Sequence, residues 1–485
     1  MDKIIELLNS DPNKAIDLLT AKTKDSTELD NLRKEYSEKN REQRSTQIGL
    51  AQKNKEVGES PNKRFVEAVR ISLPFQNKIC KSATAFEVGE PVTISPSEEN
   101  VLSDEILRLW RSNRIDDKIQ KAILLQKSEL QCALQFYIKD LKPSNWFNKI
   151  IGLNENKDVK CNLLENKNGK MTPYYDEYGH MIYFTWQYKV LNDEDKAVNY
   201  TTVYDKDNVY NFKEDSGKYV LEGKKTPHGF GKIPIVYFEQ DKPEWYLSED
   251  LIDRLELTLS RLSESNDYTG HPIMVLVGDV EGMPGKDDSG KVFTAKQTFS
   301  EETQKWVSGD VKFASYDQAP DSIKLEIETI LKFIYSLSST TDLSFDALKG
   351  MGNIAGVAVR LMFLDPIIKA KMNEGINRTS LERIINVMIG GIVTTTHRRS
   401  SSEAKKTFFK IKFNSIIPDD LKATVETVVN AVNAGIMSVE LAVEKIGASE
   451  NSSQELDKIN NDKNAAHQKE IEKISKQPKT PDAPE

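Results

Sequence analysis

The sequence predicts an α+β protein that is mainly α-helical, and three patterns support this class. Several stretches carry apolar residues at the spacing of three and four that one face of a helix requires. The stretch MIYFTWQYKV, at 181–190, alternates between two sets of side chains with the two-residue period of a strand that has one buried face. Two expected helices bracket a short β-rich segment, which predicts a helical stalk that carries a small knob.

Composition excludes several classes of protein. The chain has 485 residues, and we expect about two to four structural units. No apolar run reaches the roughly 20 residues that a membrane-spanning helix needs, and the N-terminus lacks the pattern of a signal peptide. Acidic residues outnumber basic ones by 75 to 67, which argues against a surface built throughout to hold phosphates. Three cysteines without a CxxC pair indicate reduced thiols in a cytoplasm.

The first 245 residues are expected to pass from helices to a sheet. Residues 1–60 are highly charged with weak periodicity, which predicts a solvated helical arm whose apolar face needs a partner. Helical spacing runs from Arg64 to Phe86, and glycine and proline then end the helix. Beyond the alternating strand, a turn at 205–208 and the strand-like segment 231–238 extend the antiparallel sheet.

A helix is expected to start at Ser248, a good N-cap followed by two acidic residues. The segment from about His271 to Ala319 reads as the small β-rich knob, and a second helix starts near Pro320. Both helices carry an apolar seam typical of packing against another helix. The seam residues are Leu251, Leu255, Leu259 and Leu262 in the first helix and Ile323, Ile327, Ile330 and Ile334 in the second.

The remainder is expected to be a loop, a long helix and a small helical region. Val357 to Ile376 mark a helix whose pattern passes through Pro366, so a kink is expected there. Pro418 sits at a plausible first helical position, and Gly435 closes that helix. The charged, proline-containing end of the chain predicts a disordered tail.

One motif favours a different class, a nucleotide-binding motor. Gly285 to Lys291, with Gly290 between them, fits GxxxxGK, the start of a phosphate-binding loop. Val292 replaces the hydroxyl residue that would hold magnesium, and KVFTAKQTF reads as a strand where a helix should follow. The competing interpretation is a hairpin tip in the knob. Scattered histidines and the absence of enzyme motifs give no catalytic, cofactor or metal residue, and we expect no enzyme.

The order of elements resembles the portal proteins of tailed bacteriophages, particularly the siphophage type. The segments that carry the resemblance are VGEPV at 88–92, HGFGKIPIVYF at 228–238, SEDLIDRLELTLSRLSESND at 248–267, TTDLSFDALKGMGNIAGVAVRLMF at 340–363, IIPDDLK at 416–422 and AGIMSVELA at 434–442. They extend from about residue 75 to about residue 460. Two positions depart from the family pattern: Ala355 stands where a serine is common, and Arg360 stands where a lysine is common.

The resemblance implies a portal-like fold with named regions. They are an arm (1–60), a wing of helices and antiparallel sheet (61–245), a stem helix (246–269), a β-rich clip (270–318), a second stem helix (319–339), a tunnel loop (340–353), a long kinked wing helix with a return strand (354–416), a helical crown (417–465) and a disordered tail (466–485).

The resemblance also implies a structural function and its partners. Copies of the chain would form a ring, with twelve subunits in such portals, through which double-stranded DNA enters and leaves the capsid. The partners implied are a terminase motor, a major capsid or scaffold protein, and tail or neck adaptor proteins, with no membrane. The protein would be assembled in the host cytoplasm and reside at the portal vertex of the virion. Another virion or scaffold protein built from similar helices is the further alternative.

An acidic chain suits a channel that must not grip the duplex, because each firm phosphate contact strengthens binding. The hypothesis is that a few loop residues, Lys349 first and Arg360 second, touch the DNA backbone transiently. The alternative is that Lys349 is a solvated loop residue and that Arg360 pairs with a carboxylate of the wing.

Overall fold

A computed structural model of the chain describes residues 2–38, 42–47, 49, 51–57, 63–140, 157–191, 197–269, 273–277, 280–281, 294–295, 297–302, 304–308, 310–314, 320–342, 361–395, 406–416, 421–446, 456, 458–462 and 468. Helices and strands alternate in groups, which confirms the mixed α+β class. The chain divides into two compact units, Met1–Ala347 with Leu364–Asn414 and Leu348–Phe363 with Ser415–Glu485.

The larger sheet of unit 1 is antiparallel, in the order β10-β9-β8-β7-β6, with β11 paired to β9. Its strands are β6 (Gly169–Tyr175), β7 (Met181–Leu191), β8 (Ala197–Tyr204), β9 (Asn208–Asp215), β10 (Lys218–Leu221) and β11 (Thr226–Pro227). The strand expected at 181–190 is confirmed. The expectation of a single buried face is wrong, because Tyr183 and Phe184 are both buried although adjacent residues point to opposite faces.

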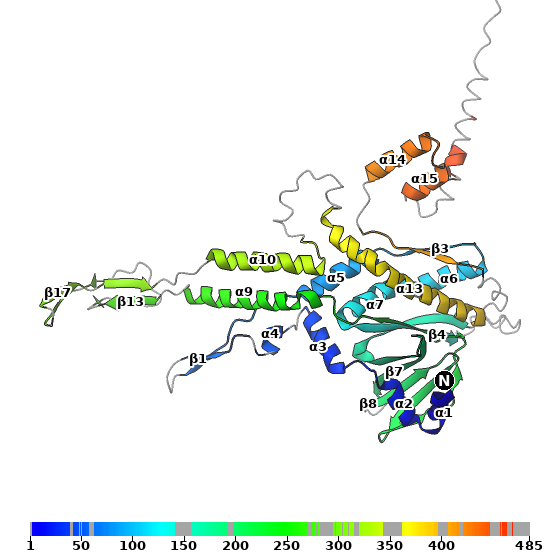
Figure 1. The fold of residues 1–485 in the computed structure, drawn as a ribbon, viewed down its shortest axis with the longest axis horizontal. Coiled ribbons are helices and arrows are strands. Elements are labelled where there is room, and N and C mark those ends of the chain that lie inside the picture. Colours follow the sequence, from blue (N-terminus) through cyan, green and yellow to red (C-terminus); the bar gives the residue numbers. More distant parts are fainter. Residues whose placement is uncertain are drawn as a thin grey trace, which may run out of the picture. The chain divides into compact units, whose positions relative to one another are not determined.

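Helices from the first 36 residues cover one of these faces. They are α1 (Asp2–Ser10) and α2 (Pro12–Thr20), whereas α3 (Ser26–Tyr36) packs in a separate apolar cluster through Leu29 and Leu32. Leu8, Ile16 and Leu19 are buried in one cluster with Tyr183 and Phe212 of the sheet, and Figure 1 shows α1 and α2 lying against it. The apolar face expected for the helical arm at 1–60 therefore has its partner within the same chain, because α1 and α2 pack on the sheet.

A second, three-stranded sheet has the order β12-β4-β5, formed by β4 (Gln131–Asp140), β5 (Lys157–Leu164) and β12 (Ile235–Glu239). The expectation that 231–238 extends the first sheet is wrong, because β12 pairs with β4, Phe238 opposite Cys132. The sequence shows the strand but cannot show its partner, since pairing is decided by contacts between distant segments.

Four helices and this second sheet together form the largest apolar core. They are α5 (Phe75–Val88), α6 (Val101–Ser112), α7 (Ile115–Glu129) and α13 (Leu364–Thr395). The helix expected from Arg64 starts later, because residues 64–66 form β2 (Arg64–Val66), which pairs with β1 (Lys55–Val57). The predicted end is confirmed at Val88, directly before Gly89. A short β3 (Thr93–Pro96) pairs with β19 (Phe409–Lys412).

The long helix differs from expectation at Pro366. Residues 361–362 are helical, 363 is a turn, and α13 begins at Leu364. Pro366 therefore lies in the first turn, where a missing N–H costs no intrahelical bond, rather than at an interior kink. The helix then continues to Thr395, well past Ile376. Near its end, a Cβ on Gly390 would lie 2.5 Å from the carbonyl oxygen of Phe230, so glycine permits the close packing there.

The two helices expected around the β-rich segment are confirmed as α9 (Glu249–Thr269) and α10 (Pro320–Ser338), which lie side by side (Figure 1). Between them are antiparallel pairs of short strands: β13 (Ile273–Val277) with β18 (Asp310–Ala314), β14 (Val280–Glu281) with β15 (Thr294–Ala295), and β16 (Gln297–Ser300) with β17 (Lys305–Ser308). Unit 2 contains α14 (Leu421–Asn433) and α15 (Val439–Ile446), separated by Gly435 at φ +70°.

Candidate functional site

The seam between α9 and α10 is a small apolar core. Trp245, Ile252 and Leu255 are buried with Ile330 and Ile334. Of the other predicted seam residues, Leu251, Leu259 and Ile327 pack at the edge of this cluster, while Leu262 and Ile323 are half-buried.

Polar contacts also join the two helices. Arg254 forms an ion pair with Glu326 at 2.6 Å. Ser248 directly precedes α9, and its hydroxyl donates to the carbonyl oxygen of Ile334 at 3.5 Å. The apolar seam and these contacts hold the two helices side by side and antiparallel, because the start of α9 lies beside the end of α10.

An acidic stripe of α9 binds described residues between 42 and 73, and sequence reasoning missed this placement. Arg44, in α4 (Arg44–Gln47), forms ion pairs with Glu249 and Asp253. Farther along α9, the Leu73 N–H donates to Glu256 at 2.7 Å, and Lys55 forms an ion pair with Glu264 at 2.8 Å. The spacing of the acidic residues by three, four or eight is the one sequence signal for this stripe.

A buried cluster of charges lies at the base of the helical pair. Lys127 of α7 forms ion pairs with Glu87 of α5 at 2.8 Å and with Glu244 at 3.3 Å. All three side chains are at most 6% exposed. Lys369 of α13 binds the other oxygen of Glu244 at 2.6 Å. Four separate segments meet here, which is why no local sequence pattern identifies the cluster.

The electrostatics of the cluster favour its charged state. Burial acts to lower the pKa of Lys127, but Glu87 and Glu244 outweigh burial and raise that pKa above its ordinary value. Burial acts to raise the pKa of Glu244, but Lys127 and Lys369 hold that pKa below its ordinary value. Cys80 lies beside the cluster, and burial raises the pKa of its thiol, so it stays protonated.

Apolar side chains remain exposed on two helices that leave the core. On α10 these are Leu325, Phe333 and Leu337, which are 65%, 54% and 46% exposed. On α13 they are Leu364, Ile368, Met372 and Ile376, at the four-residue spacing of one helix stripe and 45% to 77% exposed. A contiguous exposed apolar stripe of this kind marks a protein interface.

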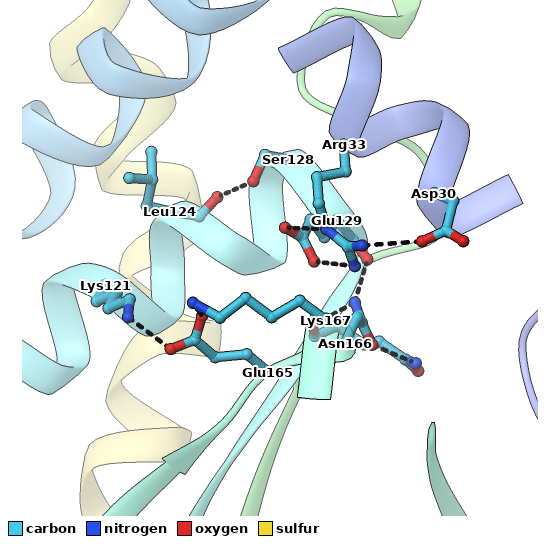
Figure 2. A network of polar contacts seen from close by, with 10 residues as sticks. Asp30, Arg33, Lys121, Leu124, Ser128, Glu129, Glu165, Asn166 and Lys167 are labelled. Carbon is cyan, nitrogen blue, oxygen red and sulfur yellow. Dashed lines mark hydrogen bonds and ion pairs between the residues drawn. The ribbon is translucent and has the colours of Figure 1, made fainter. Parts of the chain in front are cut away.

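A cavity of about 1210 Å³ lies between α3, β4, β5 and the larger sheet. Trp186, Tyr188 and Tyr200 line it with nearly parallel rings, whose centroids are 6.1 and 5.8 Å apart. Figure 2 shows the polar network beside it. Arg33 lines the cavity and donates to both carboxylate oxygens of Glu129 at 3.2 Å, which joins α3 to α7.

The other predicted site residues lie outside the described residues. These are the two candidate DNA contacts, Lys349 and Arg360, and the loop residues Gly285, Gly290 and Lys291. The segment that follows the glycine-rich motif contains the strands β15 and β16, as expected for KVFTAKQTF. Across the described ranges, no group of three or more potential ligands is placed to hold a metal ion. Nor does any described helix combine the length and apolar character needed to span a membrane.

Comparison with known proteins gives two matches. A family model described as "Phage portal protein, SPP1 Gp6-like" matches residues 17–469. The portal protein of Bacillus phage SPP1 is 22% identical over 417 residues, which cover 81% of this chain and 76% of that protein. The family match spans both sheets, the helical pair and the charged cluster.

Proposed function

This chain belongs to the SPP1 Gp6-like family of phage portal proteins, and from that premise we propose that copies of it form a ring around a channel for double-stranded DNA. The ring sits at one vertex of the capsid, where DNA enters during packaging and leaves during ejection. The protein is a structural part of the virion, assembled in the host cytoplasm, and its role is passage of DNA rather than catalysis.

The observation that carries the proposal is the exposed apolar surface of α10 and α13. Met372 and Ile376 are 77% and 63% exposed on a helix whose other end is buried, and Phe333 is 54% exposed on α10. A head-to-tail interface between identical chains buries such surfaces and closes into a ring when the rotation per subunit divides a full turn. We propose a ring of twelve, as the family resemblance implies.

The proposed regions of the ring are those that the family resemblance implies. We propose α9 and α10 as the stem, with the seam residues of both helices packed within each subunit. The β-rich segment 270–318 is the clip, residues 340–353 are the tunnel loop, and residues 417–465 are the crown. The two sheets and their helices form the wing, and α13 with β19 is its long helix and return strand.

The partners follow from the ring's place in the capsid. We propose that the clip docks the terminase motor and later the tail or neck adaptor proteins, and that the wing faces major capsid or scaffold protein. Lys349 and Arg360 are the proposed transient contacts to the DNA backbone. The net charge of −8 keeps the remaining surface from holding phosphates firmly.

Electron microscopy of the purified protein in negative stain tests the ring. Rings with a central hole, twelvefold in class averages, are the expected result. Monomers or solid particles at micromolar concentration would overturn the proposal. Charge reversal of Lys349 to Glu in assembled particles tests the DNA contact, and unchanged packaging and retention of DNA would remove that role from Lys349.

The motor alternative makes a different prediction. A nucleotide-binding motor would hydrolyse ATP, and Lys291→Ala would abolish the activity. The short strand β15, Thr294–Ala295, stands three residues after Lys291 where a phosphate-binding loop leads into a helix, so the structure gives this alternative no support.

A further inference from the structure

Lys369 contacts two elements that are distant in sequence. Its ammonium group donates to the carbonyl oxygen of Ser338, the last residue of α10, at 2.8 Å across a separation of 31 residues. The same group forms the ion pair with Glu244. The last carbonyl groups of a helix have no partner within it, and a nearby cation also interacts favourably with the helix dipole. Lys369 therefore caps α10 and ties its end to the first turns of α13.

The two halves of α13 are held in different ways. Its second half, from Leu381 to Ile392, is buried in the largest apolar core. Among the described residues, none from 364 to 380 belongs to a buried apolar cluster. The first half is instead bound through a polar stripe, and the exposed apolar stripe lies about 100° around the helix from it, because each apolar residue directly precedes a polar one.

The polar stripe is completed by two asparagines at the four-residue spacing of a helix face. Asn373 and Asn377 each donate to one carboxylate oxygen of Glu87, at 2.7 and 2.9 Å. Glu87 is paired with Lys127, Lys127 with Glu244, and Glu244 with Lys369, so the contacts form a closed circuit that starts and ends on α13.

Polar and apolar anchoring have different consequences for local opening. Hydrogen bonds and ion pairs lost on opening are replaced by bonds to water, so a polar anchor gives a smaller net barrier than a buried apolar face. Segments with few buried apolar contacts open locally at a lower free energy than the core. We therefore expect the first half of α13 to open separately from the second half, with its position set by the charged cluster.

We propose that Lys369 is the positioning residue of a latch. The latch consists of Lys369, Glu244, Lys127 and Glu87, and it holds the first half of α13 against the end of α10. Because Ser338 and Lys369 bracket the connection 339–363, the latch fixes the distance between the two ends of that connection. Its importance for DNA passage rests on the proposed function, since Lys349 and Arg360 lie within the connection.

Hydrogen exchange measured by mass spectrometry on the full chain tests the latch. Lys369→Met removes the charge and keeps the length of the side chain, and Lys369→Arg restores a cation. The matched control is Lys371→Met, two residues on, where the lysine is 67% exposed and pairs with Glu374 on the same helix. Peptides from 366–378 report on the first half of α13, and peptides from 381–392 serve as the internal reference.

In Lys369→Met we expect the amides of 366–378 to exchange at least tenfold faster while 381–392 stay unchanged. The last turn of α10 should also exchange faster, because its carbonyl cap is lost. The exchange rates of Lys369→Arg should remain within about threefold of those of the original protein, because the cation is restored. A tenfold change in exchange corresponds to about 1.4 kcal/mol. Lys371→Met should show no change.

Three results would overturn the latch. Equal acceleration of both halves of α13 would show that Lys369 supports global stability, and no acceleration would show that the polar stripe does not depend on it. An equal effect of Lys371→Met would assign the result to general charge on the helix. These measurements do not need a ring. A failure to form rings would therefore contradict the proposed function, while the latch would still be tested by hydrogen exchange.

Discussion

Replacing Lys127 by methionine removes the central cation of the buried cluster and keeps most of the side-chain volume. Glu87 and Glu244 then remain nearly fully buried, with side chains 3% and 6% exposed and no shared counter-charge. Removing one partner of a buried ion pair costs about 3–5 kcal/mol.

The remaining contacts place the expected cost at the low end of that range. Glu87 keeps the two asparagine donors, and Glu244 keeps Lys369 at 2.6 Å. We therefore expect Lys127→Met to lower the free energy of unfolding of unit 1 by about 3 kcal/mol at pH 7. With a urea dependence of about 3 kcal/mol per molar, the unfolding midpoint falls by roughly 1 M.

The assay is urea unfolding followed by tryptophan fluorescence, with Lys371→Met as the control. That lysine pairs on the surface, so its loss should cost less than about 1 kcal/mol. Equal midpoints for the two variants would refute the claim that the cluster carries buried charge.

The pH dependence follows from the directions of the two pKa shifts. The raised pKa of Lys127 contributes stability that is present below its ordinary value of 10.5 and lost as the pH rises through the folded value. The lowered pKa of Glu244 contributes stability that is present above 4.5 and lost as the pH falls through the folded value. The difference in free energy of unfolding between the original protein and Lys127→Met should therefore be largest between these limits and should shrink as Glu244 is protonated at low pH.

Three further expectations concern packing, assembly and acid stability. Gly390→Ala places a Cβ 2.5 Å from the carbonyl oxygen of Phe230 and should lower the thermal midpoint in calorimetry. Gly375→Ala on the same helix meets no atom within 4 Å and should stabilise the protein by about 0.5–1 kcal/mol. The opposite order of thermal midpoints would contradict the packing argument. Met372→Glu puts a charge on the exposed stripe and should abolish rings in micrographs while circular dichroism stays unchanged, and intact rings would remove this stripe from the interface. Burial acts to raise the pKa of Glu165, but Lys121 and Lys167 outweigh burial and lower that pKa. The stability that this ion pairing contributes should be lost as the pH falls below 4.5. In urea titrations, the free energy of unfolding of Glu165→Gln should therefore fall less steeply with decreasing pH.

Local patterns carried the prediction of individual elements. The helices at 249–269 and 320–338 have an apolar stripe and helix-start residues within their own sequence, so periodicity sufficed to identify them. The strand at 181–191 was identified in the same way. The prediction that this strand has one buried face was wrong, because burial depends on neighbouring elements. Tyr183 is buried under α1 and α2, and Phe184 is buried in a second cluster on the other face of the sheet.

The candidate site divides along the same line. The seam of α9 and α10 could be named from the sequence, since its residues recur within single helices. The latch could not, because Glu87, Lys127, Glu244 and Lys369 come from four segments and each reads as a surface charge in its own context. A lysine on a helix is usually solvated, and only the assembled core shows that Lys127 is buried.

By itself, the sequence determined the α+β class, the helical pair around a β-rich segment and the resemblance to a family, because each rests on order and period along the chain. The tertiary structure decided which strands pair, where α13 begins and which charges are buried. Those features depend on contacts between residues tens to hundreds of positions apart. Their free energy arises only when the segments meet, so no local pattern records them.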